Sequence, residues 1–332
     1  MSESQTLSKK DFKSDQEVRW CPGCGDYAIL NAVQGVCADL GTHKDDVVFV
    51  SGIGCSSRFP YYMDTYGFHT IHGRAPAFAT GVKTANPDLS VWLVTGDGDG
   101  MSIGGNHMIH VLRRNLDINI LLFNNEIYGL TKGQYSPTSP IGTRTKTSPM
   151  GSVDRPLNPL SFALGCNATF VARTIDTHMK HMTETLKAAA AHKGTSFVEI
   201  YQNCVIFNDG AFDEVADKKV RDDRTVDLVA GQPMVFGKEG DKGLRWESGT
   251  IVRCAAAEAD VWDPTLPSAA RAYAMSTLDE DPDLPNPIGV FRAVEDSIFE
   301  EEVNSQIRAA RENKGEGTLE ELIYSGETWE VS

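Results

Sequence analysis

The first 210 residues alternate short, almost wholly apolar runs with longer segments whose apolar residues recur every three or four positions. The apolar runs are residues 47–51 and the cores of LSVWLVTG, DINILLFNN, NATFVAR and TSFVEIYQN. Strands that are buried on both faces have this composition, and they need helical crossovers between them. The sequence therefore predicts an α/β fold with a doubly wound parallel sheet.

Four segments between these runs are expected to be helices. They are residues 25–40, the segment HGRAPAFATGVKTANPD, which Asn86-Pro87 should end, and the segments GGNHMIHVLRRN and HMKHMTETLKAAAAHK. A residue before proline is disfavoured in helical geometry, which makes Asn86 a natural end point.

The pattern weakens after residue 210. The formal net charge is −15 over 332 residues, and about −14 of it falls in residues 211–332. Proline-rich stretches (VWDPTLPS, DEDPDLPNP) separate two possible helical fragments at 213–230 and 292–313. We therefore expect a flexible N-terminus (1–14), an α/β domain (15–210) and an irregular acidic C-terminal arm (211–332). A solvated surface is the simple interpretation of the arm, and a partner contact is the more specific one.

Composition excludes several classes of function. Acidic residues outnumber basic ones by 46 to 31, and the sequence has no basic patch of the kind that nucleic-acid binding needs. No run of about 18 apolar residues could span a membrane, and the start MSESQTLSKKDFKSDQE lacks the apolar region of a secretory signal. Seven cysteines in a chain of this size indicate thiols or a metal site in the reducing cytoplasm.

Glycine, acidic and amide residues gather where the expected strands end. Gly52–Cys55, Gly96–Asp99, Asn124-Asn125 and Asn203-Cys204 each follow an apolar run. In an open α/β sheet the carboxyl ends of the strands form the ligand-binding edge. Asp97 and Asn125 offer the hard oxygen ligands that Mg²⁺ prefers, with the carbonyl of Ile127 as a third, and phosphate oxygens usually complete such a shell. The spacing therefore favours a diphosphate bound through a divalent cation.

Four cysteines form a second candidate site. Cys21, Cys24, Cys55 and Cys204 have the spacing C-x₂-C-x₃₀-C-x₁₄₈-C. Four thiolates suit zinc or a [4Fe–4S] cluster, and chemistry alone leaves both open beside unlinked thiols. Cys37, Cys166 and Cys254 are expected to be plain thiols.

The motifs together carry a resemblance. GDG followed by NN at this spacing is similar to the diphosphate motif of thiamine-diphosphate enzymes. The strings WCPGCGDYAIL, SGIGCSSRFPYYMDTYGFHTIHGRA, GDGDGMSIGGNH and RRNLDINILLFNNEIYGLTKGQYSPT resemble the beta subunit of 2-oxoacid:ferredoxin oxidoreductases over about residues 18–210. In the C-terminal third only LPNPIGVFR shares the resemblance.

The resemblance implies cofactors and site residues. It implies thiamine diphosphate with Mg²⁺ on Asp97, Asn125 and Ile127, and one [4Fe–4S] cluster on the four cysteines. Cofactor contacts are expected from Ile53, Gly54, Cys55, Ser56, His72, Gly98, Asp99, Gly129 and Leu130. Arg58 and Lys132 are expected to bind substrate carboxylates, with His72 positioning substrate or cofactor and Gln134 as a further donor.

The implied reaction is oxidative decarboxylation of a 2-oxoacid to acyl-coenzyme A and CO₂, with electrons passing through the cluster to ferredoxin. Only one α/β domain is visible, so an alpha subunit is expected to complete the active site. Two cations and the loop with Arg144 and Lys146 favour 2-oxoglutarate over pyruvate or a branched-chain acid. A thiamine-dependent decarboxylase or carboligase without redox chemistry, and a non-catalytic zinc-stabilised module, are the alternatives of other classes.

Overall fold

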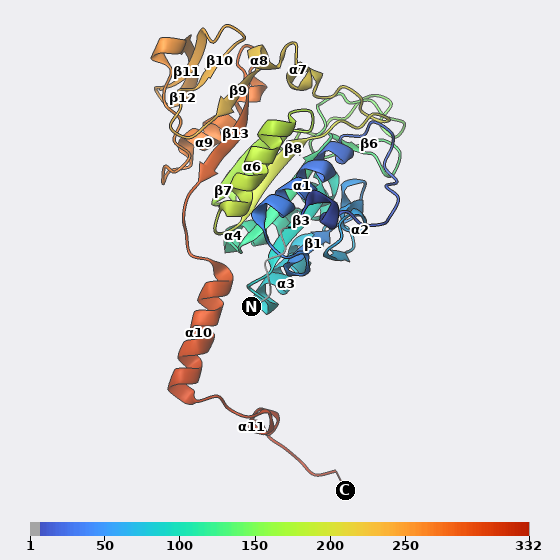
Figure 1. Cartoon of the computed structure of the whole chain (residues 1–332), viewed down its shortest axis with the longest axis vertical. Helices are drawn as coiled ribbons and strands as arrows, with labels where there is room; N and C mark the ends of the chain where they lie inside the picture. Colours follow the sequence, from blue (N-terminus) through green and yellow to red (C-terminus); the bar gives the residue numbers. More distant parts are fainter. Residues whose placement is uncertain (1–6, 332) are drawn as a thin grey trace.

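The computed structural model describes residues 7–331, which form a central sheet covered by helices on both faces (Figure 1). The strand order in this sheet is β2-β1-β3-β4-β8-β7-β13-β9. Its strands are β1 (Val47–Ser51), β2 (Tyr66–His69), β3 (Ser90–Gly96), β4 (Ile118–Asn124), β7 (Phe170–Ile175), β8 (Ser196–Tyr201), β9 (Thr225–Leu228) and β13 (Asn286–Ala293). Neighbours pair in parallel except β7 and β13, so the predicted parallel α/β sheet is confirmed, with one antiparallel junction.

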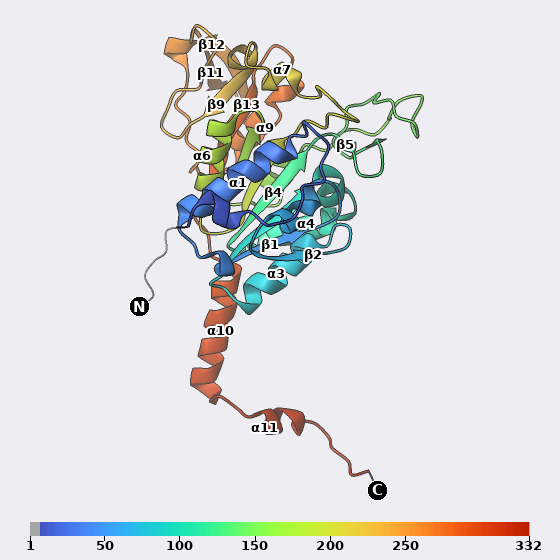
Figure 2. The same ribbon diagram turned by 45° about the vertical axis from the view of Figure 1, so that its right-hand side comes forward.

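Successive side chains of a strand point to opposite faces of the sheet, so alternate residues of one apolar strand pack against different helix layers. Val48 and Val50 of β1 join the core beneath one layer, whereas Val47 and Phe49 join the other. The first layer is α3 (Ala75–Ala85), α4 (Gly105–Arg114), α5 (Pro159–Gly165) and α9 (Ala270–Ser276). The opposite layer is α1 (Asp26–Leu40), α2 (Phe59–Tyr62) and α6 (Met179–Ala191), and Figure 2 shows α1 and α3 on opposite sides of the strands. The four helices expected from the sequence are α1, α3, α4 and α6.

The expectation of an irregular arm over 211–332 is wrong for its larger part. After α7 (Asp213–Ala216) and α8 (Arg221–Arg224), β9 and β13 extend the main sheet. A small antiparallel sheet, β10 (Val235–Phe236), β11 (Lys242–Glu247) and β12 (Thr250–Ala255), packs beside them. Its residues Leu244 and Ile251 belong to the same buried cluster as the main sheet. These short strands lack a strong local pattern, because long-range pairing rather than periodicity stabilises them.

The final residues do form an arm. The helices α10 (Phe299–Lys314) and α11 (Leu319–Ile323) lead away from the body, as Figures 1 and 2 show. Only the start of α10 is anchored: Glu300 is buried and accepts a hydrogen bond from the Asp117 amide. Residues 305–331 are exposed throughout.

The structure also differs from the expectation that residues 1–14 form a flexible N-terminus. Residues 1–6 lie outside the described part of the chain, but residues 7–14 pack against the body. Phe12 is fully buried in the core, and Lys13 bridges to Met63. A single large apolar side chain thus orders a segment whose polar composition suggested mobility.

Candidate active site

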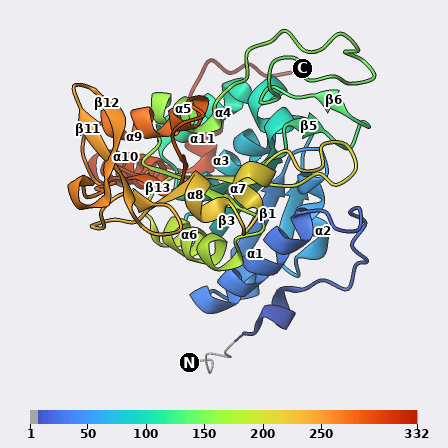
Figure 3. The same cartoon turned by 90° about the horizontal axis from the view of Figure 1, so that it is seen from above.

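Four loops meet at one edge of the sheet because β1, β3, β4 and β8 are parallel neighbours. The loops begin at Gly52, Asp97, Asn125 and Gln202, directly after the last residue of each strand. Figure 3, the view from above, shows this edge with the hairpin of β5 (Ile127–Tyr128) and β6 (Gln134–Tyr135) beside it. The sheet therefore brings together the motifs that sequence spacing singled out.

Asp97 is a buried carboxylate in this edge, with 2% of its surface exposed. Its Oδ2 accepts a hydrogen bond of 2.7 Å from the Thr138 hydroxyl. Burial raises the pKa of Asp97, whereas hydrogen bonds from Ser136 and Thr138 oppose that rise. Among the residues that the structure describes, no cationic side chain forms an ion pair with Asp97, and a metal ion would compensate its charge.

Asn125 follows the end of β4 and faces the same cavity as Asp97. Its Oδ1 accepts a hydrogen bond from the Ile127 amide at 3.1 Å, and its Nδ2 donates to Gln202 Oε1 at 2.8 Å. These two bonds fix the orientation of the amide, with its oxygen toward the turn at Ile127. Asp97, Asn125 and Ile127 together supply the oxygen donors that Mg²⁺ prefers.

Asp99 joins three segments of the edge. Its Oδ1 accepts from the amides of Ile53 (3.2 Å) and Gly73 (2.8 Å), and its Oδ2 accepts from the Thr95 hydroxyl (2.8 Å). The carboxylate is therefore committed to holding the loops together, and a diphosphate anion would meet backbone groups here rather than this carboxylate. A one-turn π-helix, Asp99–Ile103, begins at this residue, and such turns are common at functional sites.

Close backbone approach explains one glycine of the motif. A Cβ on Gly98 would lie 2.1 Å from the Tyr128 ring, and the Tyr128 hydroxyl donates to the Gly98 carbonyl at 3.1 Å. Any larger residue at position 98 would displace this ring. Tyr128 therefore shapes the site, although no sequence motif singled it out.

One cavity is lined by every residue that the sequence linked to thiamine diphosphate or Mg²⁺. These residues are Ile53, Gly54, Cys55, Ser56, His72, Asp97, Gly98, Asp99, Asn125, Ile127, Gly129 and Leu130. The side chain of His72 is 59% exposed and its Nδ1 lies 3.6 Å from Asp99 Oδ1, so His72 is not a buried core histidine. The structure thus places in one cavity the three residues that spacing singled out, Asp97, Asn125 and Ile127, and the others that the family resemblance implied.

The four cysteines line an adjoining cavity of about 450 Å³. Cys55, Asn125, Gly129 and Leu130 line both cavities. The backbone of Gly129 lies against two of these sulfurs: a Cβ built there would be in ordinary contact with the Sγ of Cys204 at 3.4 Å and with that of Cys55 at 3.7 Å. Cys37, Cys166 and Cys254 line neither cavity.

The cysteine cavity has an acidic neighbour. Burial raises the pKa of the Cys55 thiol to about 12, and the charges of Asp26 and Cys204 add to the rise. Burial likewise raises the pKa of Cys24. Asp26 is itself buried, and neither of its carboxyl oxygens has a hydrogen-bond partner among residues 7–331. Burial raises the pKa of Asp26 to about 7. Without a bound cation these thiols are neutral at physiological pH, and metal binding would release their protons.

Arg58 and Lys132 line the cysteine cavity rather than the Asp97 cavity. Arg58 Nε donates to the Tyr62 hydroxyl at 2.9 Å, and its guanidinium lies 5.8 Å from the Tyr61 ring centre. No carboxylate pairs with either cation within residues 7–331. Gln134 bonds to Thr131 of its own turn and lines neither cavity, so the expectation that it adds a donor to the site is not supported.

Sequence reasoning missed Gln202, which connects the two cavities. Its Oε1 accepts from Asn125, and its Nε2 lies 3.3 Å from Cys24 Sγ in a donor position. Its place directly after β8, two residues before Cys204, was an available signal. Thr138 was also missed, because nothing in the loop of residues 134–159 indicates which hydroxyl reaches Asp97.

The fold and the two cavities define a thiamine-dependent enzyme domain. The family model described as "Thiamine pyrophosphate enzyme, C-terminal TPP binding domain" matches residues 52–200. The chain is 51% identical to the 2-oxoglutarate oxidoreductase subunit KorB of Mycobacterium tuberculosis over 334 aligned residues, covering 98% of this chain and 89% of the relative. The chain therefore belongs to the family of 2-oxoacid:ferredoxin oxidoreductase beta subunits.

Two further comparisons agree. The beta subunit of 2-oxoacid:ferredoxin oxidoreductase 1 from Aeropyrum pernix is 45% identical over 217 residues, covering 64% of this chain and 68% of the relative. A solved structure of the 2-oxoglutarate:ferredoxin oxidoreductase from Magnetococcus marinus, with 2-oxoglutarate, coenzyme A and succinyl-CoA bound, matches with a TM-score of 0.76 and 34% identity. That match covers 97% of this chain and 96% of the other.

None of the helices among the described residues is long and apolar enough to cross a membrane.

Proposed function

We propose that this chain is the thiamine-diphosphate-binding beta subunit of a 2-oxoglutarate:ferredoxin oxidoreductase, which converts 2-oxoglutarate and coenzyme A to succinyl-CoA and CO₂ and passes two electrons to ferredoxin. The observation that carries the proposal is the adjacency of the two cavities. An oxygen-donor site and a four-cysteine site share Cys55, Asn125, Gly129 and Leu130 as walls. A decarboxylase without electron transfer has no use for the second site.

The Asp97 cavity would hold the diphosphate and Mg²⁺. Asp97, Asn125 and the Ile127 carbonyl would ligate the metal, and the backbone around Gly98 and Gly129 would approach the phosphates. Bound thiamine diphosphate would supply the nucleophilic carbon that decarboxylates a 2-oxoacid. The loops clamped by Asp99 would hold Ile53 and His72 against the rest of the cofactor.

The four cysteines would hold one [4Fe–4S] cluster. Within residues 7–331 no group of three or more histidine, cysteine or acidic side chains is arranged to hold a single metal ion. The cysteines instead line a cavity of about 450 Å³, which has room for a cluster of several atoms. The A. pernix relative and the M. marinus structure are named as ferredoxin oxidoreductases, and electron transfer favours a cluster over the zinc alternative, because zinc has no redox chemistry.

An alpha subunit would cover the open side of the site. The Asp97 cavity encloses only about 60 Å³, room for a few waters and far less than the whole cofactor. Beside it all four residues of the edge strand β2 are exposed, including Tyr66 and Phe68, and so are Ile71 and Ile103. Exposed apolar side chains around a half-open site are typical of a protein interface.

The arm of residues 299–331 is proposed as a second contact with the alpha subunit. Leu319, Leu322 and Tyr324 are 64–72% exposed, and Trp329 is 83% exposed. Removing residues 315–332 takes away no buried side chain of the described region, so the shortened chain should fold and keep its cofactors. It should bind the alpha subunit more weakly; unchanged assembly in sedimentation or size-exclusion measurements would contradict this role.

The choice of 2-oxoglutarate rests on two cations and on the relatives. Arg58 and Lys132 line the same cavity, and a substrate with two carboxylates could pair with both. An apolar branched acid would leave one cation without a partner. The M. tuberculosis relative and the M. marinus structure both carry 2-oxoglutarate in their names. A cytoplasmic location is part of the proposal, because free thiols and an iron–sulfur cluster need a reducing compartment.

The test is anaerobic purification of the complete complex, followed by iron and zinc analysis and kinetics. We expect about four iron atoms and no zinc for each copy of this chain, and a kcat/KM for 2-oxoglutarate at least tenfold above that for pyruvate with ferredoxin as acceptor. Arg58→Ala should lower the 2-oxoglutarate value more than the pyruvate value. Pyruvate as the better substrate by tenfold would reassign the substrate, and one zinc without iron would reject the redox function.

A further inference from the structure

A chain of buried polar side chains begins at Asp97 and runs beneath the sheet edge to the C-terminal part of the fold. Thr138 donates to Asp97 Oδ2 at 2.7 Å and also lies 3.0 Å from Asn124 Oδ1. Asn124 Nδ2 donates to Glu199 Oε1 at 2.8 Å. Glu199 Oε2 accepts from Arg173 Nε at 2.7 Å.

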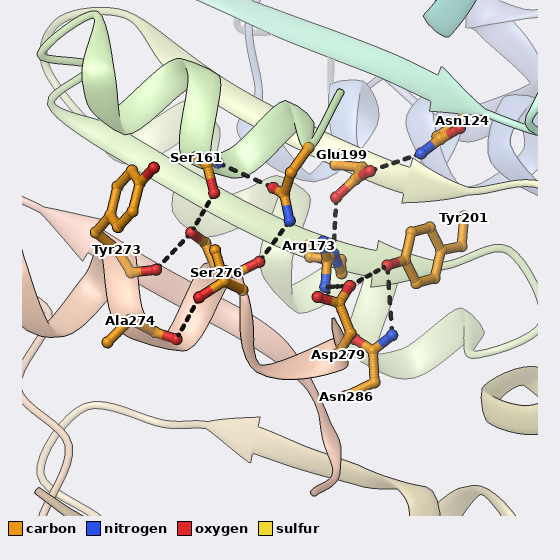
Figure 4. Close-up of polar contacts among 12 residues, drawn as sticks. Asn124, Ser161, Arg173, Glu199, Tyr201, Tyr273, Ala274, Ser276, Asp279 and Asn286 are labelled. Carbon is orange, nitrogen blue, oxygen red and sulfur yellow. Dashed lines mark hydrogen bonds and ion pairs between the residues drawn. The ribbon is translucent and has the colours of Figure 1, made fainter. Parts of the chain in front are cut away.

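This series of hydrogen-bonded side chains ends on residues outside the α/β domain that was predicted over residues 15–210. Arg173 donates to Asp279 Oδ2 at 3.1 Å and to Asn286 Oδ1 at 2.9 Å. Tyr201 donates to the same Asp279 oxygen at 3.3 Å, and the Arg173 guanidinium lies 4.8 Å from the Tyr201 ring centre. Figure 4 shows the part of this chain from Asn124 to Asn286.

The burial of the central pair makes the arrangement rigid. Arg173 is 1% exposed and Glu199 is 0% exposed, and neither lines the Asp97 cavity. A buried ion pair costs desolvation that a pair of apolar residues would avoid, so it is weak as a source of stability. Its value here is geometric, because further hydrogen bonds hold Glu199 Oε1 and Arg173 Nη1.

The direction of each hydrogen bond can be deduced from the pair. A carboxylate only accepts, so Glu199 requires the NH₂ group of Asn124 to point toward it. The Asn124 oxygen must then face Thr138 and the Glu126 amide, which donates to it at 3.2 Å. The single hydroxyl proton of Thr138 is consequently shared between Asn124 and Asp97.

We propose that the buried pair Arg173–Glu199 positions the Asp97 carboxylate for metal binding, through the two side chains that lie between them. The inference rests on the proposed function, because it assumes that Asp97 ligates Mg²⁺. Asp279 extends this series of hydrogen bonds, so the C-terminal part of the fold helps to orient the side chains behind the metal site. These are positioning residues, since none but Asp97 would touch the metal.

The test measures the Mg²⁺ concentration for half-saturation of the full complex by titration calorimetry, with thiamine diphosphate held in excess. Thr138→Val removes the hydroxyl and keeps the shape, and we expect it to weaken Mg²⁺ binding about tenfold, as changes behind a ligand commonly do. Thr138→Ser keeps a hydroxyl at this position, and its Mg²⁺ half-saturation concentration should stay within about twofold of the wild-type value. Asp279→Asn should weaken binding about threefold.

A matched control separates the hydrogen-bond chain from simple charge. Glu280 lines the same cavity as Asp279, Arg173 and Thr138, but its side chain has no hydrogen bond to the chain of residues. Glu280→Gln should therefore change Mg²⁺ binding by less than about twofold. If Asp279 acts through Thr138, adding Asp279→Asn to Thr138→Val should weaken binding no further.

The outcomes are distinguishable. A wild-type complex that binds no Mg²⁺ with thiamine diphosphate would overturn the proposed function and this inference with it. Normal wild-type binding with no effect of Thr138→Val would overturn this inference alone, as would independent effects in the double variant. If the Thr138→Val variant does not fold, the Mg²⁺ affinities of Asp279→Asn and Glu280→Gln decide. Equal losses of affinity would show that only the loss of negative charge matters, and would overturn the inference.

Discussion

The Gln202 carboxamide donates to the Sγ of Cys24 at 3.3 Å. The same side chain accepts a hydrogen bond from Asn125 at 2.8 Å, so a single residue contacts both the proposed metal site and the proposed cluster site. An N–H donor beside a cluster sulfur stabilises the more negative, reduced form.

Gln202→Leu keeps the size of the side chain and removes both contacts. We expect a more negative cluster reduction potential in the assembled complex, measured by a redox titration followed by electron paramagnetic resonance. Gln232→Leu, at an exposed position, is the control and should leave the potential unchanged. An identical potential in both variants would show that the Gln202 hydrogen bond does not tune the cluster.

Asp97→Asn should separate cofactor binding from stability. Burial raises the pKa of Asp97, which means that its ionised form is held at a cost in the cofactor-free chain. The amide keeps an acceptor for Thr138 and removes the buried charge. We expect a cofactor-free Tm equal to or above that of the wild type, with Mg²⁺-dependent thiamine diphosphate binding weakened by roughly a hundredfold or more. Differential scanning fluorimetry with and without both ligands tests this, and an undiminished ligand-induced rise in Tm would contradict it.

Replacing any one of the cluster cysteines should bleach the protein. Cys21→Ser, Cys24→Ser, Cys55→Ser or Cys204→Ser removes a thiolate ligand, and we expect loss of the broad visible absorption and of iron. Cys254→Ser makes the same chemical change in β12, away from both cavities, and should retain full colour. Retention of iron in all four variants, or loss in the control, would refute the ligand assignment.

Gly98→Ala should damage the site by steric conflict alone, because Gly98 has an ordinary helical conformation. The new Cβ would lie 2.1 Å from the Tyr128 ring, and overpacking of this kind costs about 1–3 kcal/mol. Gly35→Ala in α1 meets nothing within 4 Å and should instead stabilise the chain by up to about 1 kcal/mol. Urea unfolding of the two variants, with thiamine diphosphate binding as a second measurement, should give opposite signs.

Stability should fall on the acid side of neutral pH, partly through His178. Burial first, then the charges of Arg221 and His181, lower the pKa of His178 to about 4. Between the ordinary histidine value near 6.5 and that lowered value, the unfolded chain binds a proton that the folded chain does not. The free energy of unfolding therefore decreases as the pH falls through this window, and His178 contributes no pH dependence above it.

His178→Gln should reduce this acid sensitivity. Denaturant unfolding of the wild type and the variant at about pH 7 and about pH 5 gives the comparison, and we expect a smaller loss of stability for the variant. Equal losses in both proteins would show that His178 is not a source of the pH dependence.

Local pattern was enough for the α/β core. The apolar runs became β1, β3, β4, β7 and β8, and Asn86 does end α3. The edge strand β2 was missed because Tyr66–His69 is exposed along its whole length and shows no alternation. β9 and β13 were missed because their stability comes from pairing with each other and with β7, far away in sequence.

For the site, the amino-acid pattern was enough to identify the GDG and NN motifs and to place Cys55 and Cys204 at strand ends, whereas the family resemblance supplied the set of four cysteines. Parallel strands place their carboxyl ends at one edge, so the meeting of the strand-end motifs follows from periodicity. The side chains that support those donors could be identified only from tertiary contacts. Gln202 reaches Cys24, Thr138 reaches Asp97, and Arg173 reaches Asp279 across loops and sheets whose separation in sequence carries no signal. A buried polar atom must find a partner wherever packing allows one, and packing is a property of the whole fold.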